Sequence, residues 1–90
     1  MIRCDKTEML NRLCYTELVY ERINKKLRTH LSKHEIEKML FNIIQNTNEE
    51  YFNRRGKNIY VTNSDNNIQV TINANNYRVI TVDKIIKTKC

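Results

Sequence analysis

The sequence has little of several residue types, with one glycine, no proline and no tryptophan among its 90 residues. It also has no apolar run near the roughly 20 residues that a membrane-spanning helix needs, which excludes such a helix. The stretch Met1–Lys6 has no hydrophobic core of the kind found in a signal peptide, so we expect a cytoplasmic protein. The wealth of Asn, Ile and Lys fits an AT-rich genome, including that of a phage or mobile element.

Cysteine and histidine are too sparse and too scattered to predict a metal site. The three cysteines, Cys4, Cys14 and Cys90, are far apart and form no CxxC pair, so we expect reduced, unpaired thiols. His30 and His34 lie far from any cysteine in sequence, and no HExxH pattern surrounds them. No P-loop or dinucleotide-binding fingerprint is present. We therefore expect neither a metal nor a cofactor.

Positive charge is in excess, with 16 Lys and Arg against 10 Asp and Glu, a net charge of +6. The sequence pI is about 9.4. Such a balance favours an anionic partner: nucleic acid, an acidic protein surface or anionic lipid. The alternative is that the charge is incidental to a basic composition.

The length fits one domain spanning residues 1–90. We expect a helical part over about residues 5–47, a sheet over about 50–83 and a basic tail over 84–90. No repeat, linker or low-complexity segment interrupts this order.

Three helices are predicted before residue 48. Capping boxes at Asp5–Glu8 and Ser32–Glu35 mark the starts of the first and third helices. Thr16 suits the N-cap of the second, which should run from Glu17 to about Arg28. The third helix carries the apolar stripe of a helix packed on a core, formed by Ile36, Met39, Leu40, Ile43 and Ile44.

The stretch from Gly56 to Asp83 alternates polar and apolar residues and predicts strands over 59–62, 68–73 and 77–82, joined by Asn-rich turns. Gly56 suits a turn that needs a positive φ. Residues 49–52 form either a short first strand or a last helical turn. Adjacent apolar residues leave the facing of the last strand ambiguous. The predicted fold class is α+β, with two to three N-terminal helices packed on one face of a three- to four-stranded antiparallel meander.

The other face of this sheet is expected to be open and to carry Gln69, Thr71 and Asn73. Beside it we expect a turn with three positive charges, Asn53-Arg54-Arg55-Gly56-Lys57, and then Tyr60, Tyr77 and Arg78. The predicted binding residues are Arg54, Arg55, Lys57, Tyr60, Thr71, Asn73, Tyr77 and Arg78. Cations meet phosphates, tyrosines stack on bases and amides read base edges, which suits single-stranded nucleic acid. The alternative is a solvated polar face beside an ordinary charged turn.

Catalysis has weaker support. RNA cleavage without a metal needs a base, an acid and a cation for the phosphorane charge. Lys57 and Arg78 could supply charge, but the candidate bases are poor: His30, His34 and Glu17 lie on the helical part, and Asp83 ends the last strand. No triad or paired carboxylates occur. The sequence leans away from an enzyme; if it is one, we expect a metal-independent ribonuclease.

Three segments, YTEL, GKNIYV and INANNYRVIT, resemble a small bacterial family of unknown function. That family's pattern runs HTTEL, GKNWYV and then ITVNxxSYTIIT, and the resemblance spans about Leu10 to Lys84. Tyr15 stands where the pattern has a histidine, Ile59 replaces the tryptophan, and Asp83 lies near a second histidine position. If those histidines act as an acid/base pair, this chain has lost it. Tyr15 and Asp83, with Lys57 and Arg78, are the residues to test for catalysis.

A looser resemblance, in layout alone, is to the barnase/EndoU/colicin/RelE group of ribonuclease toxins. The leading hypothesis is a small basic domain that binds nucleic acid, most readily RNA, and is a ribonuclease-toxin relative with weak or lost catalysis. The rival is a protein-interaction module, such as a phage- or mobile-element-encoded inhibitor of a host or defence enzyme. An edge-strand homodimer is a further form of that rival.

Overall fold

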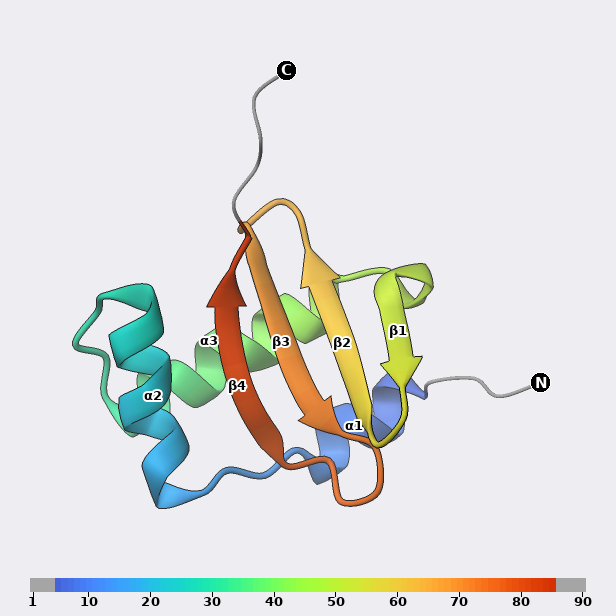
Figure 1. The fold of residues 1–90 in the computed structure, drawn as a ribbon, viewed down its shortest axis with the longest axis horizontal. Coiled ribbons are helices and arrows are strands. Elements are labelled where there is room, and N and C mark those ends of the chain that lie inside the picture. The colour runs from blue at the N-terminus through green and yellow to red at the C-terminus, as the bar shows by residue number, and fades with distance from the viewer. Residues whose placement is uncertain (1–4, 86–90) are drawn as a thin grey trace.

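The computed structural model describes residues 5–85 of the chain. Helices come first and strands second, as the α+β prediction requires. The elements are α1 (Lys6–Arg12), α2 (Glu17–Leu27), α3 (Lys33–Asn46), the 3-10 helix η1 (Glu49–Tyr51), β1 (Phe52–Arg55), β2 (Asn58–Asn63), β3 (Ile68–Asn73) and β4 (Val79–Lys84). The strands form an antiparallel meander in the order β1-β2-β3-β4. The predicted fold class is confirmed (Figure 1).

The predicted helix starts are confirmed, but the caps differ in detail. At α3 the Ser32 hydroxyl accepts from the Glu35 amide and the Glu35 carboxylate accepts from the Ser32 amide, so the capping box is complete. At α1 the Asp5 carboxylate accepts from the Glu8 amide at 3.1 Å. The Glu8 carboxylate turns instead to Arg12, at 2.9 Å, so this box is half formed.

The core lies between α3 and one face of the sheet. In Figure 1, α3 crosses behind the strands, and α2 lies beside β4 at the sheet's edge. The buried side chains of α3 are Ile36, Leu40, Ile43 and Ile44, which is the predicted stripe except that Met39 is only partly buried. The sheet contributes buried side chains from alternate strand positions, which include Ile59, Val61, Val70 and Ile72. The apolar side chains spaced three and four apart in α3 therefore pack against the apolar side chains at every second strand position.

A β-bulge resolves the ambiguous facing of β4. The register between β3 and β4 shifts between Thr71 and Ile72, so that Ile72 pairs with Val79 while Thr71 pairs with Thr81. One extra residue on β4 lets Val79 and Val82 both enter the core despite their odd spacing. Ile80, between them, stays partly exposed.

The segment between α3 and β2 combines both predicted alternatives. Residues 49–51 form a helical turn and Phe52 begins a strand. Arg54 and Arg55 therefore lie in β1 rather than in a turn, which corrects the prediction. The turn is only Gly56-Lys57, because Arg55 already pairs with Asn58. Gly56 has φ +59°, and a positive φ at the first of two loop residues is typical of a type II′ hairpin.

The last strand begins two residues later than predicted. Tyr77 has φ +56°, a left-handed conformation that no regular strand contains. Cys14, from the link between α1 and α2, pairs with this segment: its amide donates to the Tyr77 carbonyl at 3.1 Å, and its carbonyl accepts from the Val79 amide at 2.9 Å. The N-terminal half is thus tied to the edge of β4.

Within residues 5–85, no helix is both long enough and apolar enough to cross a membrane. Of the predicted basic tail, Lys84 belongs to β4. Lys87 and Lys89 lie outside the described residues.

Candidate nucleic-acid interface

The sheet face turned away from α3, called the open face here, carries polar side chains in cross-strand rows. Strand pairing aligns Arg55 with Asn58 and Asn73, then Asn53 with Tyr60, Thr71 and Thr81, then Thr62 with Gln69 and Asp83. Gln69 and Asn73 alternate with buried residues of β3, so their predicted outward facing is confirmed. Thr71 lies on the same side by register, opposite Tyr60, but is itself buried. Nearly every group here is an amide, a hydroxyl or a ring.

Tyr60 is the aromatic residue of this face, and Arg55 lies beside it. The Arg55 guanidinium carbon is 5.9 Å from the centre of the Tyr60 ring. That spacing is within the range of a cation–π contact and gives a base both a ring and a cation. Thr71 faces outward but is only 5% exposed. Its cross-strand neighbours Tyr60 and Thr81 flank it closely, so it offers a ligand little surface.

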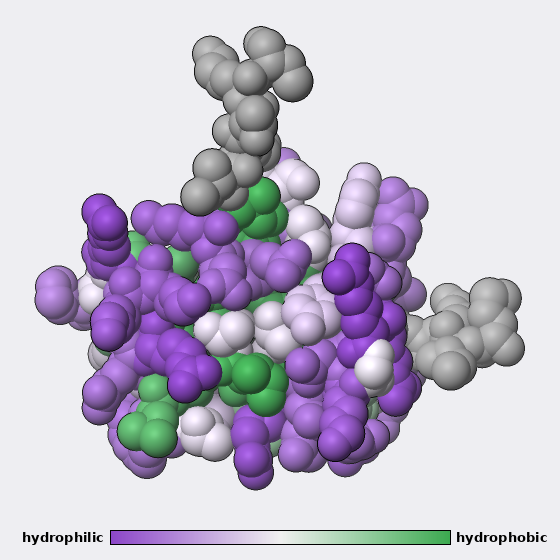
Figure 2. Space-filling view, viewed as in Figure 1, coloured by the Kyte–Doolittle hydropathy of each residue, from purple (hydrophilic) through white to green (hydrophobic). Residues whose placement is uncertain are grey.

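The open face has almost no negative charge. The four strands contain one acidic residue, Asp83, and its carboxylate pairs with Lys26 of α2 at 2.8 Å. Arg22 lies four residues before Lys26 and so shares its side of α2. In the hydropathy view of Figure 2 this face has a pale and partly green centre, with strongly hydrophilic, purple side chains on either side. Cations frame a largely uncharged surface.

The structure divides the predicted basic cluster. Arg54 pairs with Ile59, whose side chain is buried, so Arg54 projects from the core side of the edge strand. Its Nε donates to the Gly56 carbonyl at 3.1 Å. Arg55, one residue on, projects from the open face. Successive residues of a strand face opposite ways, so these two arginines do not both face a ligand bound on the open face.

Lys57 and Arg78 are brought together at one end of the sheet. The Lys57 carbonyl accepts from the Ala74 amide at 2.7 Å, and the Arg78 carbonyl accepts from the Asn73 amide at 2.9 Å. Tyr77 lies elsewhere: the Arg12 guanidinium carbon is 5.0 Å from its ring centre, and its hydroxyl donates to Glu8 at 3.5 Å. The expected grouping of Tyr77 with Tyr60 is therefore wrong, because the left-handed backbone turns Tyr77 against α1.

The candidate catalytic residues do not converge. Asp83 and Arg78 are five residues apart along the β4 segment, roughly 15 Å at strand rise. The Asp83 carboxylate forms an ion pair with Lys26. Among the predicted bases, Glu17 pairs with Lys33 at 2.7 Å. Within residues 5–85, no cluster of three or more His, Cys, Asp or Glu side chains is placed to hold a metal.

Tyr15 is placed for packing rather than for proton transfer. Its ring stacks on Tyr20, with ring centres 5.5 Å apart and planes 17° from parallel. Burial, and then the negative charge of Glu37, raise the pKa of Tyr15 well above its ordinary range, so the phenol stays protonated at neutral pH. Burial and a hydrogen bond to Glu37 likewise raise the pKa of Tyr20 to about 12.

The Tyr15 hydroxyl is buried and has no hydrogen-bond partner in the described part of the chain. Replacing Tyr15 with phenylalanine is therefore expected to raise the free energy of unfolding by about 1 kcal/mol. Tyr20→Phe, which removes the bond to Glu37, should instead lower it by about 1 kcal/mol. Urea unfolding followed by circular dichroism measures both. A loss of stability in Tyr15→Phe would contradict the idea that its hydroxyl is unsatisfied.

Two features of the candidate interface were not among the predicted site residues. The first is the pair Lys26 and Arg22, which flank the open face from α2. The second is a polar hollow at the other end of β2, lined by residues of the α3 end and the β2–β3 loop. Neither has a local sequence signal, because each joins segments far apart in the chain.

Fold and surface together define a small α+β domain with one open, cation-framed sheet face. A family model described as "Protein of unknown function (DUF3781)" matches residues 7–83, and the chain belongs to that family. This confirms the resemblance to a small family of unknown function. No curated protein and no solved structure matches the chain significantly. The likeness to ribonuclease toxins gains no support from these comparisons.

Proposed function

We propose that the protein binds single-stranded nucleic acid, most readily RNA, across the open face. The observation that carries this proposal is the Arg55–Tyr60 pair, 5.9 Å apart, on a face whose sole strand carboxylate is already neutralised by Lys26. Phosphates meet little repulsion there. The partly exposed Tyr60 ring can stack on a base, and the neighbouring guanidinium adds charge and cation–π attraction.

The amide side chains give this surface a means of contacting base edges. Asn58, Gln69 and Asn73 are half-buried, and each lies next to the Tyr60 row. An unpaired base exposes donors and acceptors that such amides match. A duplex hides those edges, so we expect single strands to bind better than duplex DNA.

The test is binding of labelled single-stranded RNA and of duplex DNA at low and moderate salt. We expect salt-sensitive binding that favours the single strand, since phosphate contacts release counterions. No binding to either at low salt would overturn the proposal. Gel analysis of the same RNA tests for cleavage; we expect the RNA to remain intact, because the candidate catalytic groups are dispersed.

Neighbouring arginines provide a matched pair of variants. Arg55→Ala should weaken RNA binding and reduce the salt slope by about 0.7, the value for one contact on a single strand. Arg54→Ala removes the same charge from the opposite side of the same strand and should change binding little. Tyr60→Ala should weaken binding about tenfold through lost stacking. Equal effects of Arg54→Ala and Arg55→Ala would mean that net charge, not this face, binds the RNA.

A protein-interaction role is the second candidate, and the free edge of β1 favours it. Within residues 5–85, β1 pairs with β2 alone. Arg54 and Arg55 lie on opposite sides of this edge strand. Their positive charges disfavour pairing with β1 of a second copy of the chain. An acidic strand from another protein would suit it better. If RNA binding fails, affinity capture with the wild type and a doubly substituted Arg54→Glu, Arg55→Glu chain tests this role; equal capture would exclude this edge.

We place this function in the cytoplasm as part of the proposal. The support is the exposed, unpaired thiol of Cys14, which fits a reducing compartment.

A further inference from the structure

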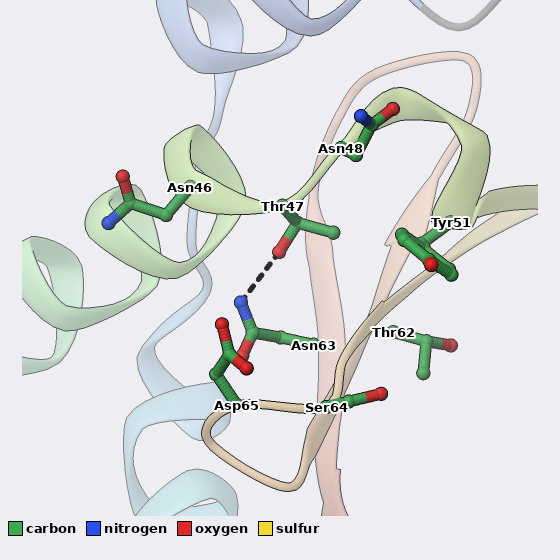
Figure 3. A pocket seen from close by; sticks show the side chains of 8 residues that line it. All are labelled: Asn46, Thr47, Asn48, Tyr51, Thr62, Asn63, Ser64 and Asp65. Carbon is green, nitrogen blue, oxygen red and sulfur yellow. Dashed lines mark hydrogen bonds between the residues drawn. The ribbon is translucent and has the colours of Figure 1, made fainter.

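A polar hollow of about 280 Å³ lies between the end of α3, η1 and the β2–β3 loop (Figure 3). It is lined by Asn46, Thr47, Asn48, Tyr51, Thr62, Asn63, Ser64 and Asp65. The hollow borders the open face, because Thr62 belongs to both: its hydroxyl donates across the strands to the side-chain oxygen of Gln69 (Oε1) at 3.4 Å. An RNA strand that followed β2 along the open face would meet the rim of the hollow at Thr62.

The floor of the hollow is held by hydrogen bonds, so its polar atoms already have partners within the protein. The Asn63 side-chain amide (Nδ2) donates to the Thr47 hydroxyl at 2.8 Å, and the Thr47 hydroxyl donates to the Ile43 backbone carbonyl at 2.6 Å. The Asn63 side-chain oxygen (Oδ1) accepts from the backbone amide of Asn66 at 2.8 Å and from its side-chain amide at 3.0 Å. These bonds hold the floor rigid, so contacts to a ligand must come from the other lining side chains.

Four lining side chains, those of Asn46, Tyr51, Ser64 and Asp65, form no hydrogen bond within residues 5–85, and two of them provide a ring or a charge. Tyr51 is 51% exposed although it is a large aromatic residue. The Asp65 carboxylate has no hydrogen bond or ion pair with any residue from 5 to 85. In Figure 3 the two lie on opposite sides of the hydrogen-bonded Thr47–Asn63 pair. The hollow thus combines an exposed ring with an unused, acceptor-only group.

From this arrangement we infer that the hollow is a base-recognition site selective for guanine, with Tyr51 stacking on the base and Asp65 accepting from its Watson–Crick edge. This inference deepens the proposed function and rests on it for the RNA strand. A carboxylate has two acceptor oxygens and no donor. Guanine alone among the four bases offers two adjacent donors, its N1–H and 2-amino group, to such a pair.

The other bases fit less well. Adenine and cytosine each place a ring nitrogen acceptor beside their amino group, and uracil flanks its single N–H with two carbonyl oxygens, so each would set an acceptor against the carboxylate. Asp65 also repels phosphate, so a phosphate site is not expected here. The volume lies just below the roughly 300–1,000 Å³ of pockets for drug-sized ligands and suits a single base.

The experiment follows backbone amide shifts by NMR while free mononucleotides are added to the whole chain. GMP is expected to shift signals around Tyr51 and Asp65 and to bind about tenfold more tightly than IMP, which lacks the 2-amino group. AMP, CMP and UMP should bind no better than IMP. Asp65→Asn and Tyr51→Ala should each remove the preference. Asn75→Ala, in the exposed β3–β4 turn and outside the hollow, should retain it and serves as the control.

A U-rich RNA with one guanosine, compared with the same RNA carrying one adenosine, separates this inference from the proposed function. RNA binding without a guanine preference, unaffected by Asp65→Asn, would overturn the guanine site and leave the open face intact. GMP binding without any RNA binding would retain the site and overturn the proposed function. Equal binding of GMP and IMP would show that Asp65 does not read two donors and would overturn the inference.

Discussion

Replacing Leu40 with alanine is expected to lower the free energy of unfolding by about 2–5 kcal/mol. Leu40 is fully buried in the core stripe of α3, between the helix and the sheet. The substitution removes apolar contacts and leaves a cavity that a tightly packed interior fills only in part. A domain of this size has about 5–15 kcal/mol of stability in total, so a large share is lost. Urea unfolding followed by circular dichroism measures the change.

Leu18→Ala is the matched control, since it is the same chemical change on the surface. Leu18 is 73% exposed on α2. Its truncation should change the free energy of unfolding by no more than about 0.5 kcal/mol. Similar losses at both positions would mean that α3 does not pack on the sheet as described.

Asn63→Ala is expected to lower the free energy of unfolding by about 2–3 kcal/mol. Asn63 is a polar residue in the core, only 5% exposed, and its amide joins the end of α3 to the β2–β3 loop (Figure 3). Alanine leaves the Asn66 amide without its acceptor and the Thr47 hydroxyl without one donor. A buried polar group that loses its partner bears its full desolvation penalty. Thermal or urea unfolding tests this.

Asn75→Ala provides the comparison. Asn75 is exposed in the β3–β4 turn, where its backbone amide, not its side chain, donates to Asn73. We expect a change within about 0.5 kcal/mol. If Asn63→Ala proved equally harmless, the hydrogen bonds around Asn63 would not stabilise the fold, and the floor of the proposed guanine site would not be rigid.

Local sequence signals predicted the elements well where the pattern depends on neighbours along the chain. The Ser32–Glu35 capping box and the stripe that follows defined α3, because a helix brings residues three and four apart onto one face. The alternation in β3 assigned Gln69 and Asn73 to the open face, because successive strand residues point opposite ways. Gly56 marked its turn because other residues rarely take a positive φ.

The candidate site was predicted only in part, because its members depend on exact register. A cluster of basic residues in sequence does not reveal where the strand begins. Once β1 starts at Phe52, pleating sends Arg54 and Arg55 to opposite sides. One extra residue in β4 likewise changes which side chains enter the core, and a left-handed Tyr77 leaves the expected surface.

The sequence by itself determined the order of helices and strands, the apolar face of each and the excess of positive charge. Only the tertiary structure decided which polar residues share a surface. Lys26 meets Asp83 across 57 residues of sequence, and Asn63 meets Thr47 across 16. Periodicity is a property of neighbouring residues, whereas such pairs form only when packing of the apolar faces fixes how α2 and α3 lie against the sheet.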